Sequence, residues 1–165
     1  MEWMPFELRP SPNPTLRPEE DYLQTAWANS VYPVAKNMGI PIVLPRVSPQ
    51  PHTHLAFEGF QYAKEKGSGN EYNGRVLRAF FQEELDIGDL GVLAHLADEV
   101  GLNTAEFRKA LETRRYQQAH QKALHHAHNE AKVSAVPTFI IRDQRLPGLQ
   151  SRETLERVMG STKVP

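Results

Sequence analysis

The side chains that could perform chemistry in this sequence are histidines and carboxylates, because no cysteine is present. This chain therefore cannot supply a thiolate for disulfide exchange, for metal binding or for nucleophilic attack. It also contains no glycine-rich phosphate loop, no Gly-x-Ser-x-Gly elbow and no His-Glu-x-x-His helix. What remains is a set of seven histidines and one dense run of acids, whose spacing decides whether they can act together.

Four of the histidines lie in one stretch, 114–131, that is predicted to be a helix: His120, His125, His126 and His128. Neutral imidazoles bind zinc, nickel and copper, so the group raises a metal hypothesis. On a regular helix only His125 and His128, three residues apart, share a face. Two ligands do not make a specific site. We therefore interpret the stretch as a polar, solvated helix, and we predict no metal and no other cofactor.

The other histidines and the acids also favour structural interpretations. His52 and His54 follow a proline-rich loop; His54 could cap a helix or line a cleft, and we favour a hydrogen-bonded loop histidine. His95 lies among apolar residues and is predicted to be a half-buried packing residue. The acidic run flanks a helix junction, where carboxylates commonly cap helices rather than form an acid–base pair. We assign no catalytic role to its members, Glu83, Glu84, Asp86 and Asp89.

Length and composition predict one folded domain with no electrostatic preference for nucleic acid or membranes. Of the 165 residues 39% are hydrophobic and 24% charged, which suits a single domain or a small domain with an insert. The formal net charge is −1, so nothing favours an anionic partner. No apolar run approaches the roughly 20 residues that span a bilayer. The start, Met1 to Pro5, lacks the features of a signal peptide, so we expect a cytoplasmic protein.

The order of the predicted elements indicates an α/β sheet that is interrupted by a long helical insert. Alternation over 3–8 predicts a short strand whose apolar members are Trp3, Phe6 and Leu8. A closing helix is predicted over 152–159, with Ser151 as its N-cap. Two further strands are predicted, one over 138–141 and one that begins at Leu146. A first helix is predicted to begin at Pro18 and to kink or end at Pro33. Further helices are predicted over 53–66, over 71–85, over 89–100, from Thr104 and over 114–131. The sheet portion is thus assigned to 1–17 and 132–165, and the helical insert with its connecting helices to 18–131.

The most informative stretch is Ala135-Val136-Pro137-Thr138-Phe139-Ile140-Ile141, followed by Leu146-Pro147-Gly148 and the closing helix. It resembles the DsbA-like branch of the thioredoxin superfamily, most closely its FrnE-type members. Further pieces fall in the order of that family over nearly the whole chain. They are the segment from Trp3 to Pro10, the stretch from Leu77 to Glu83, and the stretches 86–89, 93–97 and 100–102.

The resemblance implies an incomplete thioredoxin-like α/β fold with a large α-helical insert. In the family the proline of the Val-Pro-Thr motif is cis, and the preceding residue pairs through its backbone with an extended substrate. By resemblance, Pro137 is cis, and Val136 and Pro137 are the substrate-binding residues. The ligand would be a peptide or a small molecule.

The sequence departs from the family where the family performs its chemistry. Family members begin with a strand and a helix that carries Cys-x-x-Cys or a Ser/Cys variant, and neither has a counterpart here. No catalytic residue can be carried over, so we expect this chain to be redox-inactive although its family consists of thiol–disulfide oxidoreductases. The alternatives are a peptide or small-molecule binding module, a truncated hydroxychromene-carboxylate isomerase or glutathione-transferase-kappa-like protein, and a non-functional fragment.

The missing first strand also poses a structural problem, because in the family it lies between the second and third strands. Its absence leaves two unpaired strand edges, and unpaired backbone groups are costly when buried. The two halves of the sheet could pair directly, a second chain could cover the gap, or the sequence could be part of a longer protein. We expect an incomplete sequence and a homodimer.

Overall fold

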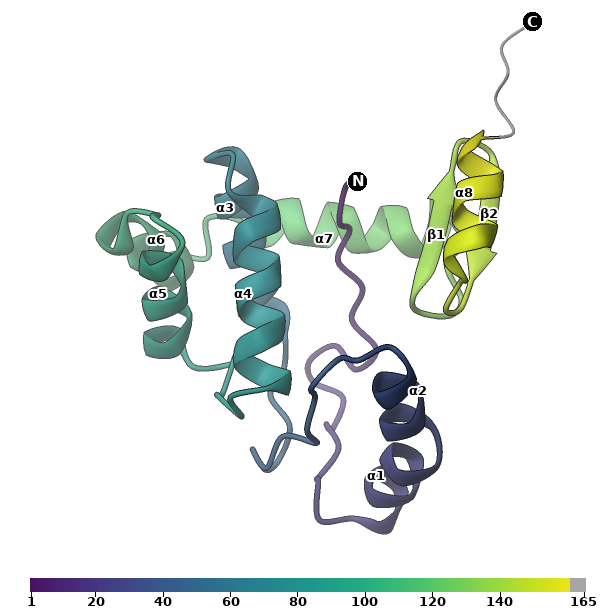
Figure 1. Cartoon of the computed structure of the whole chain (residues 1–165). Coiled ribbons are helices and arrows are strands. Elements are labelled where there is room, and N and C mark those ends of the chain that lie inside the picture. Colours follow the sequence, from purple (N-terminus) through teal and green to yellow (C-terminus); the bar gives the residue numbers. More distant parts are fainter. Residues whose placement is uncertain (161–165) are drawn as a thin grey trace, which may run out of the picture.

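The computed structural model describes residues 1–160, which form a helical body, a separate helix below it and a C-terminal arm (Figure 1). The body contains α3 (His54–Glu65), α4 (Gly69–Phe81), α5 (Leu90–Glu99) and α6 (Thr104–Glu112). From it α7 (Gln117–His125) and the π-helical turn η2 (His126–Glu130) lead to the arm. The arm is residues 132–160, with β1 (Thr138–Ile141), β2 (Gln144–Pro147) and α8 (Arg152–Gly160).

Local signals set the helix boundaries of the body. Asn103 begins α6 because its side-chain Oδ1 accepts the N–H of Glu106 at 2.9 Å, and Asp89 caps α5 through the N–H of Val92 at 2.8 Å. Gly67 follows α3 and Gly101 follows α5, both in the left-handed region that favours glycine. The predicted helices over 53–66, over 89–100 and from Thr104 are therefore confirmed.

Two predicted helices are shorter than expected. The helix predicted over 71–85 ends at Phe81, and Glu84 has a positive φ of 56° that the helix cannot contain. The helix predicted over 114–131 begins only at Gln117, because Arg114 has a φ of 52°, which is incompatible with a helix and reverses the chain in the turn after α6. Both residues use this backbone conformation to aim a charged side chain at a distant partner.

The core lies where α3 contacts α4, α5, α6 and α7. Tyr62 on α3 is its centre: its ring meets Phe107 edge-on at 5.4 Å and Tyr116 at 5.9 Å. Burial raises the pKa of the Tyr72 phenol, which points into the same core from α4. Such edge-to-face pairs add stability beyond the burial of their area. Phe60 on α3 and Phe80 on α4 belong to the same core.

A substitution at Gly59 tests how tightly this core is packed. A methyl group there would lie 2.7 Å from Phe107 and 3.0 Å from the Tyr72 ring, and both rings are buried. We expect Gly59→Ala to lower the free energy of unfolding by about 1–3 kcal/mol through overpacking. The matched control is Gly74→Ala on α4, where nothing lies within 4 Å. That variant should gain about 0.5–1 kcal/mol in urea unfolding, and equal effects at both sites would contradict the packing argument.

The helix below the body, called the lower helix, is residues 21–37. It consists of α1 (Asp21–Ala26), the π-helical turn η1 (Trp27–Val31) and α2 (Tyr32–Asn37). Of the two outcomes predicted for Pro33, a kink or an end, the end does not occur, because the helix continues to Asn37. The N–H of Tyr32 donates to Trp27 O, five residues earlier, so the turn before Pro33 has π-helical rather than α-helical hydrogen bonds. A wider turn of this kind accommodates the proline ring within a continuing helix.

The N-terminal segment, residues 1–9, is extended but is not a strand, so the strand predicted over 3–8 is wrong. Its inward residues are Pro5 and Glu7, whereas Leu8, predicted to be apolar interior, is 74% exposed. The segment descends beside the body and stays apart from the arm (Figure 1). Within residues 1–160 the sheet has only β1 and β2, so the two halves of the family sheet do not pair directly.

The arm forms as its sequence predicts. The strand predicted over 138–141 is β1, and it pairs antiparallel with β2, which begins at Gln144 rather than at Leu146. Ser151 caps α8 by accepting the N–H of Thr154 at 3.2 Å. The α/β character of the fold is therefore confirmed. Within residues 1–160, no helix combines the length and the apolar character needed to cross a bilayer.

Candidate functional site

The residues predicted to bind a substrate, Val136 and Pro137, lie where the chain enters β1. Their peptide bond is cis, as are those of Ser11–Pro12 and Ser48–Pro49. Two hydrogen bonds fix the loop around Val136 and Pro137. The Pro137 carbonyl accepts the N–H of Gly148 at 2.7 Å, and the Thr138 hydroxyl donates to Ala135 O at 2.5 Å. Val136 is 40% exposed. The loop is therefore anchored through its backbone and presents its side chains outward.

One edge of β1 is free in the described part of the chain. Ile141 pairs with Gln144 across a two-residue turn, so Phe139 and Ile141 exchange their hydrogen bonds with β2. The alternation of an antiparallel ladder then directs the N–H and C=O groups of Thr138 and Ile140 to the opposite side, where residues 1–160 supply no strand. A free edge of this kind is a template for pairing with another extended chain.

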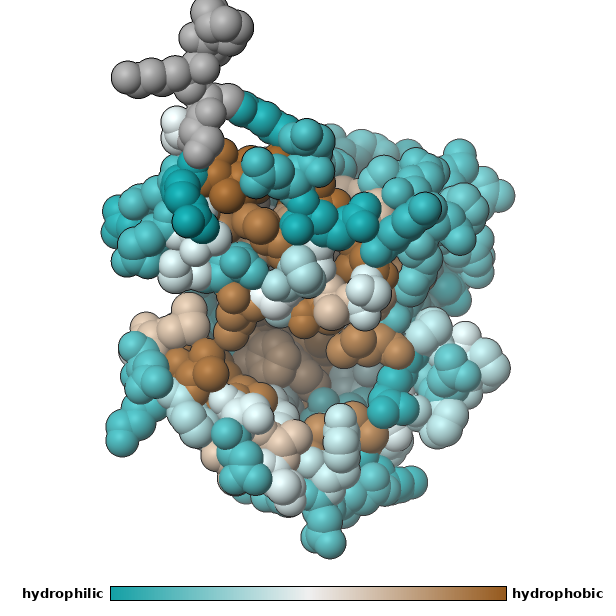
Figure 2. All heavy atoms as spheres, turned by 90° about the vertical axis from the view of Figure 1, so that its right-hand side faces the viewer, coloured by the Kyte–Doolittle hydropathy of each residue, from teal (hydrophilic) through white to brown (hydrophobic). Residues whose placement is uncertain are grey.

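An apolar hollow lies between the arm and the lower helix. Figure 2 views the molecule from that side and shows hydrophobic side chains gathered in a depression below the arm. The elements that border it carry exposed apolar side chains. These are Met4 and Leu8 in the N-terminal segment, Val34, Met38 and Ile40 in α2 and after it, and Val136, Ile140, Leu149 and Met159 in the arm. Exposed apolar surface that gathers in one place marks an interaction site.

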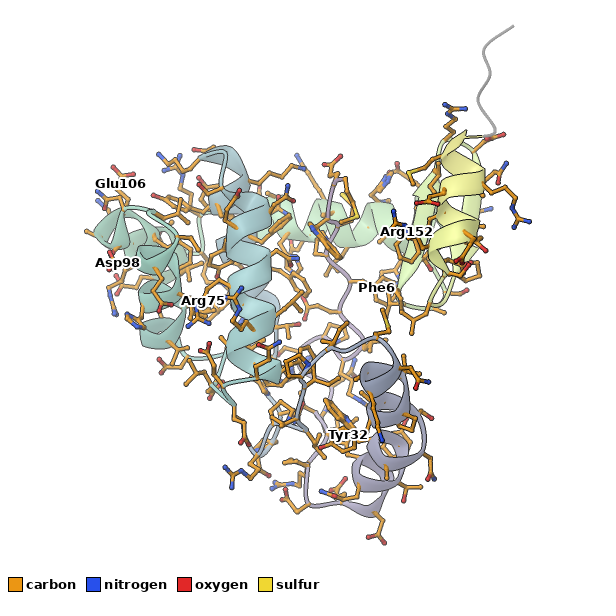
Figure 3. All side chains as sticks on the ribbon, viewed as in Figure 1. Phe6, Tyr32, Arg75, Asp98, Glu106 and Arg152 are labelled. Atoms are coloured by element: carbon orange, nitrogen blue, oxygen red, sulfur yellow. The ribbon has the colours of Figure 1, made fainter. Side chains whose placement is uncertain are left out.

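A buried pair fixes the N-terminal segment, which faces the arm. Glu7 Oε1 lies 2.5 Å from His120 Nε2, and the two side chains are only 4% and 3% exposed. Phe57 on α3 stacks on the His120 ring at 5.4 Å, with 18° between the planes. Next to this anchor, Phe6 contacts His128 at 4.7 Å and points toward the arm (Figure 3). The Glu7–His120 pair thus positions the ring of the neighbouring Phe6 between the N-terminal segment and the arm.

A second buried carboxylate lies nearby on α3. Glu58 is fully buried and accepts three hydrogen bonds from Arg114, the shortest at 2.6 Å from Nη2. This bonding raises the pKa of Arg114 against the effect of its burial. Burial, helped by the charge of Arg114, lowers the pKa of His54, while Glu7 and Glu58 oppose that shift. His54 thus begins α3 beside these charges, and its Nδ1 has no partner within residues 1–160.

Sequence reasoning missed Glu7 and the role of His120. The sequence places His120 among three other histidines of a predicted solvated helix, and Glu7 lies within the strand predicted over 3–8. No local signal in the sequence marks Glu7 as buried; only the structure places it on the same inward face as Pro5 and leaves Leu8 exposed. A carboxylate on a buried face requires a partner, but the sequence does not say which residue 113 positions away supplies it.

The remaining histidines are arranged differently from the prediction that His125 and His128 share a face. The π-helical turn η2 brings both His125 and His126 to Glu130, at 3.8 and 2.8 Å, and turns His128 to Phe6. Within residues 1–160 no three histidine or acidic side chains are placed to hold a metal ion. The prediction for His95 is wrong: its side chain is 68% exposed and lies 3.8 Å from Glu99.

The acidic run serves caps and ion pairs, as interpreted. Asp89 caps α5, and Asp86 accepts the N–H of Gly88 at 2.8 Å. Glu84 accepts three hydrogen bonds from Arg46, two from the guanidinium at 2.8 and 3.0 Å and one from the backbone N–H at 3.1 Å. Glu83 and Glu99 hold Arg75 between α4 and α5, at 2.8 and 2.7 Å (Figure 3). These carboxylates are occupied by structural partners.

Comparison with known proteins identifies relatives over the whole described fold. The family model of the DSBA-like thioredoxin domain matches residues 1–160. The uncharacterized protein YwbO of Bacillus subtilis (strain 168) is 52% identical over 160 residues, which are 96% of this chain and 80% of that protein.

Two solved structures share the fold. A 2-hydroxychromene-2-carboxylate isomerase aligns with a TM-score of 0.70 at 24% identity, over 86% of this chain and 66% of that structure. A Nitrosomonas europaea protein provisionally named a protein disulfide isomerase aligns with a TM-score of 0.69 at 15% identity, over 93% of this chain and 78% of that structure. The chain thus spans about two thirds to four fifths of the length of these three proteins.

Proposed function

Because this chain belongs to the DSBA-like thioredoxin domain family but contains no cysteine, we propose that it is a redox-inactive member that binds an extended polypeptide. The observation that carries the proposal is the free edge of β1 beside an apolar hollow. In this proposal residues 1–17 and 132–165, of which 161–165 lie outside the described residues, are the thioredoxin-like portion and 18–131 the helical insert. The proposed setting is the cytoplasm, since a function without thiols does not depend on an oxidising compartment.

Affinity would come from the main chain of β1. The outward N–H and C=O groups of Thr138 and Ile140, together with the exposed loop at Val136 and Pro137, can pair with an added strand in the manner of β-augmentation. Side chains of the added strand alternate between two faces. The exposed Val136 and Ile140 would contact one of these faces, and the hollow would receive apolar residues.

The similarity to the isomerase structure supports the fold rather than a reaction. At 24% identity it transfers no catalytic group, and the residues around Val136 and Pro137 include no thiol and no paired acid and base. Binding is therefore the function that the geometry supports best.

The first test measures redox activity and binding on the same preparation. We expect no reduction of insulin disulfides by dithiothreitol above the uncatalysed rate, because the chain offers no thiolate. We expect saturable binding of reduced, carboxymethylated α-lactalbumin, an unfolded chain without free thiols, measured by fluorescence anisotropy. Catalysed reduction would exclude the redox-inactive part of the proposal.

A proline substitution tests the edge itself. Ile140→Pro removes an outward N–H while leaving the hydrogen bonds of Phe139 and Ile141 to β2 in place. We expect it to weaken binding of the unfolded chain at least about tenfold, whereas the matched control Ile140→Val retains the N–H and should bind normally. Circular dichroism verifies that both variants fold. Equal affinity of the two folded variants would show that the edge is not the binding site.

A further inference from the structure

The N-terminal segment contacts histidines of three different elements. One lies in η2, one in α7 and one in the loop that precedes α3. The contacts are Phe6 with His128 at 4.7 Å between ring centroids, Glu7 with His120 at 2.5 Å between Oε1 and Nε2, and Arg9 with His52 at 3.3 Å between the carbonyl oxygen and Nδ1. Histidine changes charge between about pH 5 and 8, so the attachment of this segment is exposed to protons in that range.

His54, the first residue of α3, is a fourth histidine at this attachment. It is half-buried, and its enclosed Nδ1 has no hydrogen-bond partner within residues 1–160. Burial, and then the charge of Arg114, lowers the pKa of His54. The charges of Glu7 and Glu58 oppose that shift, and His52 reinforces it. The N-terminal segment, α3, the loop before α3 and the turn after α6 thus each present a charged or titratable group to His54.

We propose that acidification releases the N-terminal segment, because His54 takes up a proton more readily once the segment has moved away from the start of α3. The segment covers this place through its buried residues Pro5 and Glu7 and through the bond from Arg9 to the loop histidine. The device goes beyond the proposed binding of a polypeptide and does not rest on it. It is a local opening of one segment while the body remains folded.

The direction of the effect follows from the surroundings of His54. Well above its ordinary pKa of 6.5, His54 is neutral whether the segment is attached or released, so it adds no pH dependence. Below that value the released state, in which water reaches the ring, binds a proton that burial and Arg114 oppose in the attached state. The released population therefore rises as the pH falls, by at most about tenfold per pH unit for one proton.

The other three histidines do not favour release. A charged His120 pairs more strongly with the Glu7 carboxylate than a neutral one does. His52 donates the same hydrogen bond to the Arg9 carbonyl whether it is neutral or charged. His128 contacts an aromatic ring, which can accept a cation. Of these four histidines, His54 is thus the one whose protonation opposes the attached segment.

A single introduced thiol measures the release, because the chain contains no other cysteine. Pro5→Cys places the thiol at a buried position of the segment, where dithiodipyridine reaches it only after release. Dividing by the rate of an unfolded peptide with the same cysteine removes the pH dependence of the reagent. From about pH 7.5 to about 5.5 we expect the protection of this thiol to fall about threefold to tenfold.

Three further variants, the first two made in the Pro5→Cys chain, identify the proton and the moving part. His54→Gln cannot titrate and should make the protection independent of pH. His95→Gln, whose histidine is 68% exposed on α5, should leave the fall unchanged. Val76→Cys, made alone, places a thiol in the core on α4 and should stay protected over the whole pH range, since the body does not open.

Several results would overturn the inference. They are a protection at Pro5→Cys that is constant or rises as the pH falls, the same fall in the His54→Gln chain, and a parallel fall at Val76→Cys, which would mean that the whole body opens. If His54→Gln does not fold, a magnetic resonance titration of the unchanged chain replaces it. The imidazole of His54 should then titrate below pH 6.5 with the same midpoint as the signals of Phe6, and separate midpoints would contradict the release.

Discussion

Arg114→Met is expected to lower the free energy of unfolding by about 3–5 kcal/mol, because it leaves a buried carboxylate without its partner. Glu58 is fully buried, and all its side-chain hydrogen bonds among the described residues come from Arg114. The lost stability is therefore the cost of an uncompensated charge within the body rather than the net worth of an ion pair. Urea unfolding followed by circular dichroism measures it.

Two controls separate these contributions. The double variant Glu58→Leu with Arg114→Met removes both charges and should recover most of the loss, since apolar replacements of buried pairs are often neutral. Arg115→Met changes the neighbouring arginine, whose side chain is 64% exposed and lies 3.8 Å from Glu65, and should cost less than about 1 kcal/mol. If the double variant is no more stable than Arg114→Met, the loss has a cause other than the orphaned charge.

His120→Leu is expected to have an effect of similar size, about 3–5 kcal/mol, because it leaves Glu7 buried with neither carboxylate oxygen bonded within residues 1–160. The effect should be local as well as global. Since Glu7 anchors the N-terminal segment, hydrogen exchange of residues 3–9 should rise before the body unfolds. Loss of this anchor should also weaken binding at the hollow that the segment borders.

The matched variants make that result specific. Glu7→Leu with His120→Leu removes both polar groups and should restore much of the stability. His125→Leu, on the exposed side of the same helix, should change stability by less than about 0.5 kcal/mol. A large drop for His120→Leu without faster exchange in residues 3–9 would show that Glu7 is not what holds the segment in place.

The Glu58–Arg114 and Glu7–His120 pairs fix the elements that position the proposed binding site without forming part of it. The Glu58–Arg114 pair joins α3 to the turn between α6 and α7, and the Glu7–His120 pair joins the N-terminal segment to α7. α7 in turn leads to the arm with its free strand edge (Figure 1). The geometry of the proposed binding site therefore depends on buried polar contacts that lie outside it.

Elements whose signals are local can be predicted from the amino-acid sequence alone. Asn103 and Ser151 mark helix starts because their side chains accept backbone N–H groups three residues on, and strand 138–141 follows from its apolar, β-branched composition. The motif around Val136 and Pro137 likewise located the family and the arm, and the family model confirms the former. Such features need only neighbours within a few residues, so the sequence contains all the information they require.

Features that depend on a partner far along the chain become visible only in the folded molecule. The segment 3–8 has the alternation of a strand but is not one, because strand status requires a paired neighbour and residues 1–160 supply none. The burial of Glu7 depends on His120, which lies 113 positions away. The burial of Glu58 depends on Arg114, whose own backbone has a positive φ. Long-range pairing, unlike helix capping, is decided by how the elements pack.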